Sequence, residues 1–127
     1  MKHYPSQIVY ITVLFIILIS LGTIFTPQVT LLNSSNIRIV DANISTSYSD
    51  LKFWSLNDGD DKDLYYSIFQ KEGKYRYHFS LKNNITLSGE CGYVKNFEFG
   101  KRVIFLISDD KVIYSSDKPV ICETFEI

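Results

Sequence analysis

The two cysteines of this 127-residue chain, Cys91 and Cys122, are the first residues whose spacing and type suggest chemistry. In a domain displayed outside the cytoplasm they would be exposed to oxidation, so we predict a disulfide between them. On the chain-entropy model such a bond is worth roughly 3 to 4 kcal/mol. The alternative is two buried thiols in a cytoplasmic domain. A zinc site is less well supported, because two cysteines and one distant histidine fall short of the usual four ligands.

His78 is the only histidine outside the N-terminal tail. Histidine is the side chain that changes charge closest to neutral pH, which makes His78 a candidate pH sensor. Its place on the polar side of an alternating segment favours a plain exposed histidine. A Ser/His/Asp or Cys/His catalytic arrangement would have to use this same residue, and no nucleophile elbow accompanies it. We therefore predict that the protein is not an enzyme and carries no cofactor.

A turn rich in aspartates is the third feature whose residue types suggest chemistry. Carboxylates are calcium ligands, but the order of acids, glycine and a terminal glutamate that defines an EF-hand loop is missing. A solvated hairpin tip is the favoured interpretation, and we predict no metal site. The four acids are Asp58, Asp60, Asp61 and Asp63.

The charge balance excludes one class of partner and the composition indicates a fold class. With 13 basic and 14 acidic residues the net charge is -1, which disfavours nucleic-acid binding. Nine Tyr and nine Phe stand against a single Ala. Because alanine is the preferred filler of soluble helices and aromatic residues favour pleated surfaces, this balance predicts strands.

An apolar run near the N-terminus predicts a membrane helix. The eighteen residues from Ile8 to Phe25 carry no charge, and at about 1.5 Å per residue they span roughly 27 Å of hydrocarbon. Pro27 ends the helix just after the run. Lys2 precedes the run and the next charge is Arg38, so the positive-inside rule places the N-terminus in the cytoplasm. We predict a signal anchor that contacts membrane lipid.

A cleaved signal peptide is the competing interpretation of this run. Ser20-Leu21-Gly22 offers a small-x-small cleavage site, although the apolar stretch continues beyond it. With the anchor retained, the predicted organisation has four parts. They are a cytoplasmic N-terminus at 1–7, a transmembrane helix at 8–25, a linker at 26–36 and an extracytoplasmic β domain at 37–127.

Alternating apolar residues place His78 and Cys91 on strands. The clearest segment is YRYHFSL, residues 75–81, where Tyr75, Tyr77, Phe79 and Leu81 share one face and Arg76, His78 and Ser80 the other. The apolar parity changes between Ile37 and Ile44, which suggests a bulge in one long strand. Further strands are expected at 51–56 and 64–69 as a hairpin through the aspartate turn, at 93–99, at 103–107 as a central strand covered on both faces, and at 120–127 as an edge strand after Pro119.

The fold class predicted from these segments is all-β. Seven or eight short strands with tight turns describe a small antiparallel barrel or sandwich, preceded by the one N-terminal transmembrane helix.

This layout resembles the FidL-like and ToxS-type families, small bitopic accessory proteins of membrane-bound winged-helix transcription regulators. The resemblance covers Lys2 before the apolar run, the β-rich domain after it, and the segment ITLSGECGYVKNFEFGKRVIFLI at residues 85–107. It implies a single-pass protein of the bacterial inner membrane with its C-terminal domain in the periplasm. No functional residue is carried over.

The role that this resemblance implies is binding and stabilising the sensor domain of a membrane-bound regulatory protein. It also implies a shared barrel that admits an apolar ligand such as a bile salt. An incomplete small sheet leaves an edge that a partner strand can cover, which makes such a role physically reasonable. The alternative is a stand-alone secreted or anchored envelope domain with a binding or structural function.

Overall fold

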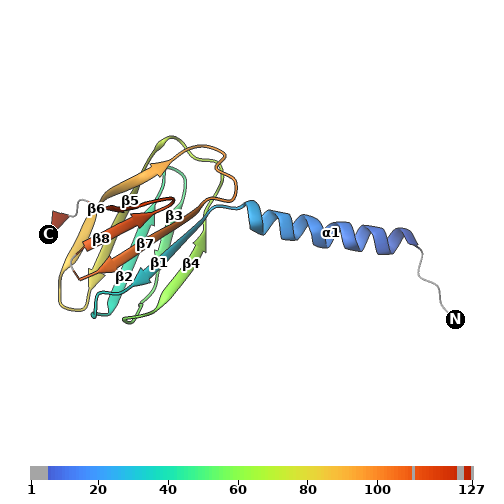
Figure 1. The fold of residues 1–127 in the computed structure, drawn as a ribbon. Coiled ribbons are helices and arrows are strands. Elements are labelled where there is room, and N and C mark those ends of the chain that lie inside the picture. Colours follow the sequence, from blue (N-terminus) through green and yellow to red (C-terminus); the bar gives the residue numbers. More distant parts are fainter. Residues whose placement is uncertain (1–5, 110, 123–124, 127) are drawn as a thin grey trace.

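A computed structural model describes residues 6–109, 111–122 and 125–126 of the chain as one helix followed by two β-sheets (Figure 1). The first sheet has the strand order β4-β1-β7-β8-β9, and the second has the order β10-β6-β5-β2-β3. The all-β prediction is therefore confirmed as a sandwich. Its elements are α1 (Ser6–Phe25), β1 (Gln28–Asn33), β2 (Ile39–Ser45), β3 (Asp50–Phe53), β4 (Asp61–Tyr65), β5 (Gly73–Leu81), β6 (Thr86–Val94), β7 (Arg102–Ser108), β8 (Lys111–Ser115), β9 (Pro119–Ile121) and β10 (Phe125–Glu126).

The core lies between the two sheets and is rich in aromatic rings. On β5, Tyr75, Tyr77 and Phe79 are at most 2% exposed, whereas Arg76 and His78 are exposed, which confirms the predicted alternation. Tyr75 of the second sheet meets Phe105 of the first with ring centroids 5.7 Å apart, in the edge-to-face arrangement that aromatic pairs prefer. The inward residues of both sheets therefore form one continuous core.

Strand β1 lies inside the predicted linker, so the linker prediction is wrong for residues 28–33. This strand pairs with β7 in parallel, from Gln28 opposite Arg102 to Asn33 opposite Ile107, and with β4 in the antiparallel sense. Val29 and Leu31 are fully buried in the core. The sandwich therefore starts well before Ile37. The segment looked like a linker because it is short, uncharged and followed by polar turn residues, while its pairing partner lies more than seventy residues away.

The predicted hairpin through the aspartate turn is also wrong. Strand β3 lies at an edge of the second sheet and β4 at an edge of the first, so the turn between them crosses from one sheet to the other. The predicted seven or eight strands are too few, because β1 lies in the predicted linker and the predicted strand at 120–127 is divided into β9 and β10. The described residues form two sheets of five strands, with one parallel pair among antiparallel ones.

Two further strand predictions need correction. Strand β7 is central in its sheet, but Ile104 is 43% exposed, so only one face is covered. Strand β6 ends at Val94, and Phe97 and Phe99 lie in the following loop with half of each side chain exposed. Aromatic alternation in that loop imitated the pattern of a strand.

Irregularities that were predicted from local sequence are confirmed. The register between β2 and β5 shifts between Ile39 and Asp41, as the change of parity indicated. Pro119 begins β9 at an edge of the first sheet, where its missing N–H donor is tolerated. The predicted strand at 120–127 is divided, because β10 pairs with β6 at an edge of the second sheet. Residues 123, 124 and 127 lie outside the described residues.

The helix leaves the sandwich at the point where β1 enters the first sheet (Figure 1). The Gly100 N–H donates to the Phe25 carbonyl at 2.6 Å, and the Arg102 guanidinium donates to the Thr26 carbonyl at 2.7 Å. From Ser6 to Ser20 every side chain of α1 is exposed. Within the described part of the chain, no helix was found that is both long and apolar enough to cross a membrane. The predicted transmembrane helix is therefore not supported by the structure.

Two tyrosines share a hydrogen bond inside the core. The hydroxyl groups of Tyr66 and Tyr75 lie 2.7 Å apart, and the two rings meet edge to face. Burial raises the pKa of Tyr66 to about 12 and also raises the pKa of Tyr75. The folded state thus holds these protons more tightly than the unfolded state, where the ordinary value is about 10. The stability linked to this difference is complete below about pH 10 and is lost as pH rises further.

We therefore expect the free energy of unfolding to fall as pH rises from about 10 to 12. Urea titrations at a series of pH values, followed by near-ultraviolet circular dichroism, measure this fall. The Tyr66→Phe, Tyr75→Phe double variant is the control, and most of the fall should disappear in it. An equal fall in the wild type and the double variant would contradict the assignment.

Candidate functional site

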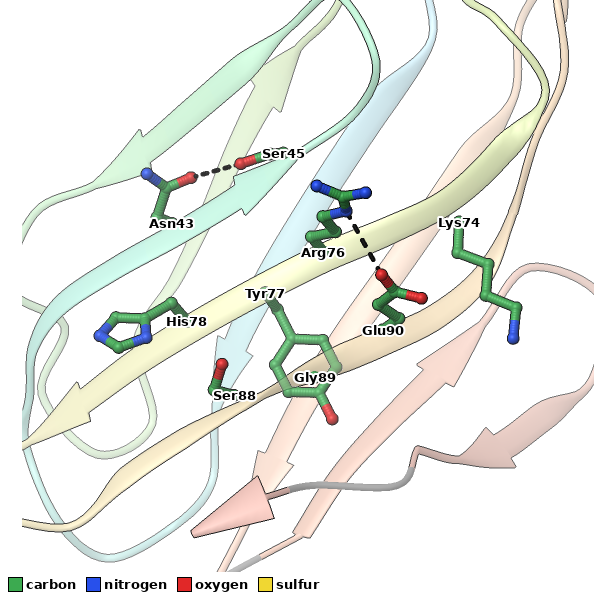
Figure 2. A pocket seen from close by; sticks show the side chains of 9 residues that line it. All are labelled: Asn43, Ser45, Lys74, Arg76, Tyr77, His78, Ser88, Gly89 and Glu90. Carbon is green, nitrogen blue, oxygen red and sulfur yellow. Dashed lines mark hydrogen bonds and ion pairs between the residues drawn. The ribbon is translucent and has the colours of Figure 1, made fainter. Parts of the chain in front are cut away.

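A shallow groove crosses the outer face of the second sheet over β2, β5 and β6 (Figure 2). It lies on the side of the sheet that faces away from the core, so strand alternation supplies it with the polar side chains of each strand. The lining residues are Asn43, Ser45, Lys74, Arg76, Tyr77, His78, Ser88, Gly89 and Glu90. We refer to this surface as the outer-face groove.

Strand register arranges the groove residues in two rows across the sheet. Arg76 on β5 lies opposite Ser45 on β2 and Glu90 on β6. His78, two residues further along β5, lies opposite Asn43 and Ser88. Directly opposed side chains on one face of a sheet have Cβ atoms about 5 Å apart and act together. The groove therefore presents one charged row beside one neutral polar row.

The charged row contains an ion pair that stays open to water. The Nε of Arg76 lies 3.3 Å from a carboxylate oxygen of Glu90, and the two side chains are 77% and 53% exposed. An exposed pair of this kind contributes only about 0 to 1 kcal/mol to folding. Figure 2 shows this pair together with the hydrogen bond that the Ser45 hydroxyl donates to the Asn43 amide oxygen at 3.1 Å. These groups can be drawn into contacts with a ligand at little cost to the fold.

His78 lies in the neutral polar row with its side chain exposed. The alternation of residues 75–81 already placed His78 and Arg76 on one face, and the structure adds Glu90 of β6, which local sequence patterns did not indicate. Donors and acceptors at this spacing can bind an extended polypeptide or another polar molecule. A sensing role for His78 stays a prediction.

Cys91 and Cys122 form a disulfide, as predicted, with their Cα atoms 5.5 Å apart. Cys91 lies on β6 of the second sheet, and Cys122 directly follows β9 of the first. Both are less than 10% exposed, so the bond is part of the core and not of the groove. The disulfide is a covalent link between the two sheets.

The acids of the aspartate turn accept hydrogen bonds from the protein itself. Each of three acids accepts a hydrogen bond from the surrounding chain, Asp58 from the Asn36 N–H, Asp60 from the Asn57 N–H and Asp63 from the Thr30 hydroxyl. Among the described residues, no group of three or more His, Cys, Asp or Glu is placed to hold a metal ion. Asp58 and Asp60 therefore stabilise the turn that crosses between the sheets, and Asp63 links β4 to β1 within the first sheet.

Comparison with known proteins yields a fold and no family. No family model and no curated protein matches the chain. The chain is similar to a solved structure described as an NMR structure of the protein from Eubacterium rectale, with a TM-score of 0.53 and 12% identity over 73% of this chain and 89% of that one. At this identity the likeness shows the fold alone.

Replacing both cysteines, as Cys91→Ala with Cys122→Ala, should lower the free energy of unfolding by about 3 to 4 kcal/mol, because the disulfide closes a loop of about thirty residues. Urea denaturation measures the loss, and the reduced wild type should lose a similar amount. Two reactive thiols in the native protein without reductant would show that the bond is absent.

Proposed function

We propose that this protein is a membrane-anchored, non-enzymatic binding module. In this proposal α1 (Ser6–Phe25) holds the sandwich at the outer surface of a bacterial inner membrane, and the outer-face groove binds a protein partner. The observation that carries the proposal is the helix itself. The large apolar side chains of its described part are 47% to 74% exposed, on every side of the helix.

Such a helix needs an apolar environment that the sandwich does not provide. Leaving a large aliphatic side chain in water instead of burying it costs about 1.5 to 3 kcal/mol. An apolar surface of this extent is characteristic of a contact with another molecule or with lipid. The uncharged run of eighteen residues up to Phe25 is close to the length of a bilayer span, which favours lipid.

Two independent features support the side of the membrane that we propose for the sandwich. Lys2 precedes the apolar run, which favours a cytoplasmic location for the segment before the helix. The disulfide between Cys91 and Cys122 is the bond expected in an oxidising compartment. Both features favour a periplasmic sandwich.

The outer-face groove favours a protein partner over a small apolar ligand. Its exposed side chains are polar or charged, and its Arg76–Glu90 ion pair can be exchanged for contacts with a partner at little cost. The resemblance to FidL-like and ToxS-type proteins suggests the partner, the sensor domain of a membrane-bound winged-helix regulator. A bile-salt-like ligand would require an apolar cavity shared with that partner.

Co-purification from detergent tests this function. The full-length protein should purify in a stoichiometric complex with a membrane-bound winged-helix regulator encoded beside it. Arg76→Glu should weaken the complex and lower thermal stability only slightly, because the introduced carboxylate and the opposing Glu90 are both exposed to water. Lys62→Glu, an equal charge reversal on β4 in the other sheet, is the matched control and should bind normally.

Two results would contradict the proposal. A stable monomer with no companion would favour a stand-alone envelope domain. A complex that tolerates Arg76→Glu and Lys62→Glu equally would place the partner on a surface other than the groove.

A further inference from the structure

The two ends of the sandwich differ in what they expose. Strand β1 enters at Gln28, which lies opposite Tyr65 at the end of β4 and Arg102 at the start of β7. The loops at 66–72 and 95–101 therefore lie at the end from which α1 emerges (Figure 1). The crossing turn at 54–60 lies at the opposite end, where the Asp60 carbonyl accepts from the Asn33 N–H.

Exposed aromatic residues gather at the end next to the helix. Each of these residues, including Phe25 at the end of α1, is 47% to 61% exposed. We call this surface the aromatic end: Phe25, Tyr48, Tyr65, Phe69, Tyr93, Phe97 and Phe99. Trp54 is the other exposed aromatic residue of the described sandwich, and it follows β3, whereas the Tyr48 loop precedes that strand.

Four of these rings form a continuous chain that begins on the helix. The ring centroids of Phe25 and Phe99 lie 6.4 Å apart, those of Phe99 and Phe97 6.2 Å, and those of Phe97 and Phe69 5.4 Å. The apolar surface of α1 therefore continues without a break onto the sandwich. Whatever environment receives the helix also meets these rings.

The backbone conformation of Phe97 is unusual for a bulky residue. Its φ angle is +58°, in the left-handed region that favours glycine or asparagine and is rare for bulky residues. Hydrogen bonds from the Phe97 N–H to Ile68 and from the Phe99 N–H to Phe97 hold this conformation. A bulky ring kept on a strained, exposed turn points to a function for that ring outside the fold.

Cationic side chains accompany the rings at this end. The Lys71 ammonium lies 5.8 Å from the Tyr48 ring, the Lys95 ammonium lies 5.7 Å from the Tyr93 ring, and both lysines are exposed. The opposite end carries the acids of the crossing turn, Asp58 and Asp60 among them. Aromatic rings with exposed lysines beside them match the headgroup region of an anionic bilayer.

We infer that the aromatic end is a membrane-contact surface that lies in the headgroup region of the bilayer in which α1 is anchored. This inference rests on the proposed function, because it takes the helix as the anchor. The rings from Phe25 to Phe69 reach the boundary of the acyl chains, and Lys71 and Lys95 bind lipid phosphates. The sandwich then stands on the membrane, and the outer-face groove faces sideways toward other membrane proteins.

Tryptophan fluorescence in vesicles tests the inference, because the chain contains a single tryptophan. The full-length protein is reconstituted in phosphatidylcholine and phosphatidylglycerol vesicles with and without lipid brominated near the top of its acyl chains. Three reporters are compared: native Trp54, Phe69→Trp in a Trp54→Phe background, and Leu14→Trp in the same background. Phe69 is chosen because its ring contact is with Phe97 and not with the helix.

Strong quenching is expected for Phe69→Trp and Leu14→Trp, and no quenching for Trp54. Quenching of Leu14→Trp alone would overturn the inference and leave the anchor intact. If none of the reporters is quenched, the anchor fails together with the inference. Tyr48→Trp in the same background is a second reporter on the aromatic end, so a folding defect of one variant does not decide the result. Unquenched emission from both aromatic-end reporters overturns the inference.

Discussion

The parallel pairing of β1 with β7 is the interaction on which the rest of the structure depends. It places the first strand after the helix inside the first sheet, between the edge strand β4 and the central strand β7, with Val29 and Leu31 in the core. The Tyr66 N–H donates to the Pro27 carbonyl at 3.1 Å, so the chain is held to the sandwich within two residues of the end of the helix. The end of α1 is therefore fixed to one end of the sandwich, and that end is the one rich in exposed aromatic rings.

Strand β6 connects the core to the outer-face groove. Its consecutive residues point to opposite sides, so Glu90 enters the groove while Cys91 enters the core and joins Cys122. The disulfide attaches β6 of the second sheet to the residue that follows β9 of the first sheet. Because the groove rows depend on the register of β6 against β5, the covalent link also steadies the groove.

Much of the fold was readable from short patterns. The alternation at 75–81 predicted the core face of β5. The parity change near Ile39 predicted the bulge, and Pro119 predicted the edge strand that begins there. The disulfide followed from the count of cysteines and an expected compartment. Each of these signals is local, because it depends on one strand or one bond.

The features that sequence reasoning missed depend on pairing between distant segments. Nothing within residues 28–33 indicates that the partner is β7, and the aspartate turn is compatible with a hairpin as well as with a crossing between sheets. The rows of the groove were missed for the same reason, since Arg76 meets Glu90 only through the β5–β6 register. The strand prediction at 93–99 was wrong at Phe97 and Phe99, because an exposed aromatic loop shows the same alternation as a half-buried strand.

Amide hydrogen exchange of the folded full-length protein tests the central pairing most directly. If β1 is a central strand, the amides of residues 28–33 that bond within the sheet should exchange only by global unfolding, as slowly as those of β7. Fast exchange at 28–33 beside slow exchange at 102–108 would show that the segment is a linker. Such a result would contradict a sandwich that begins at β1.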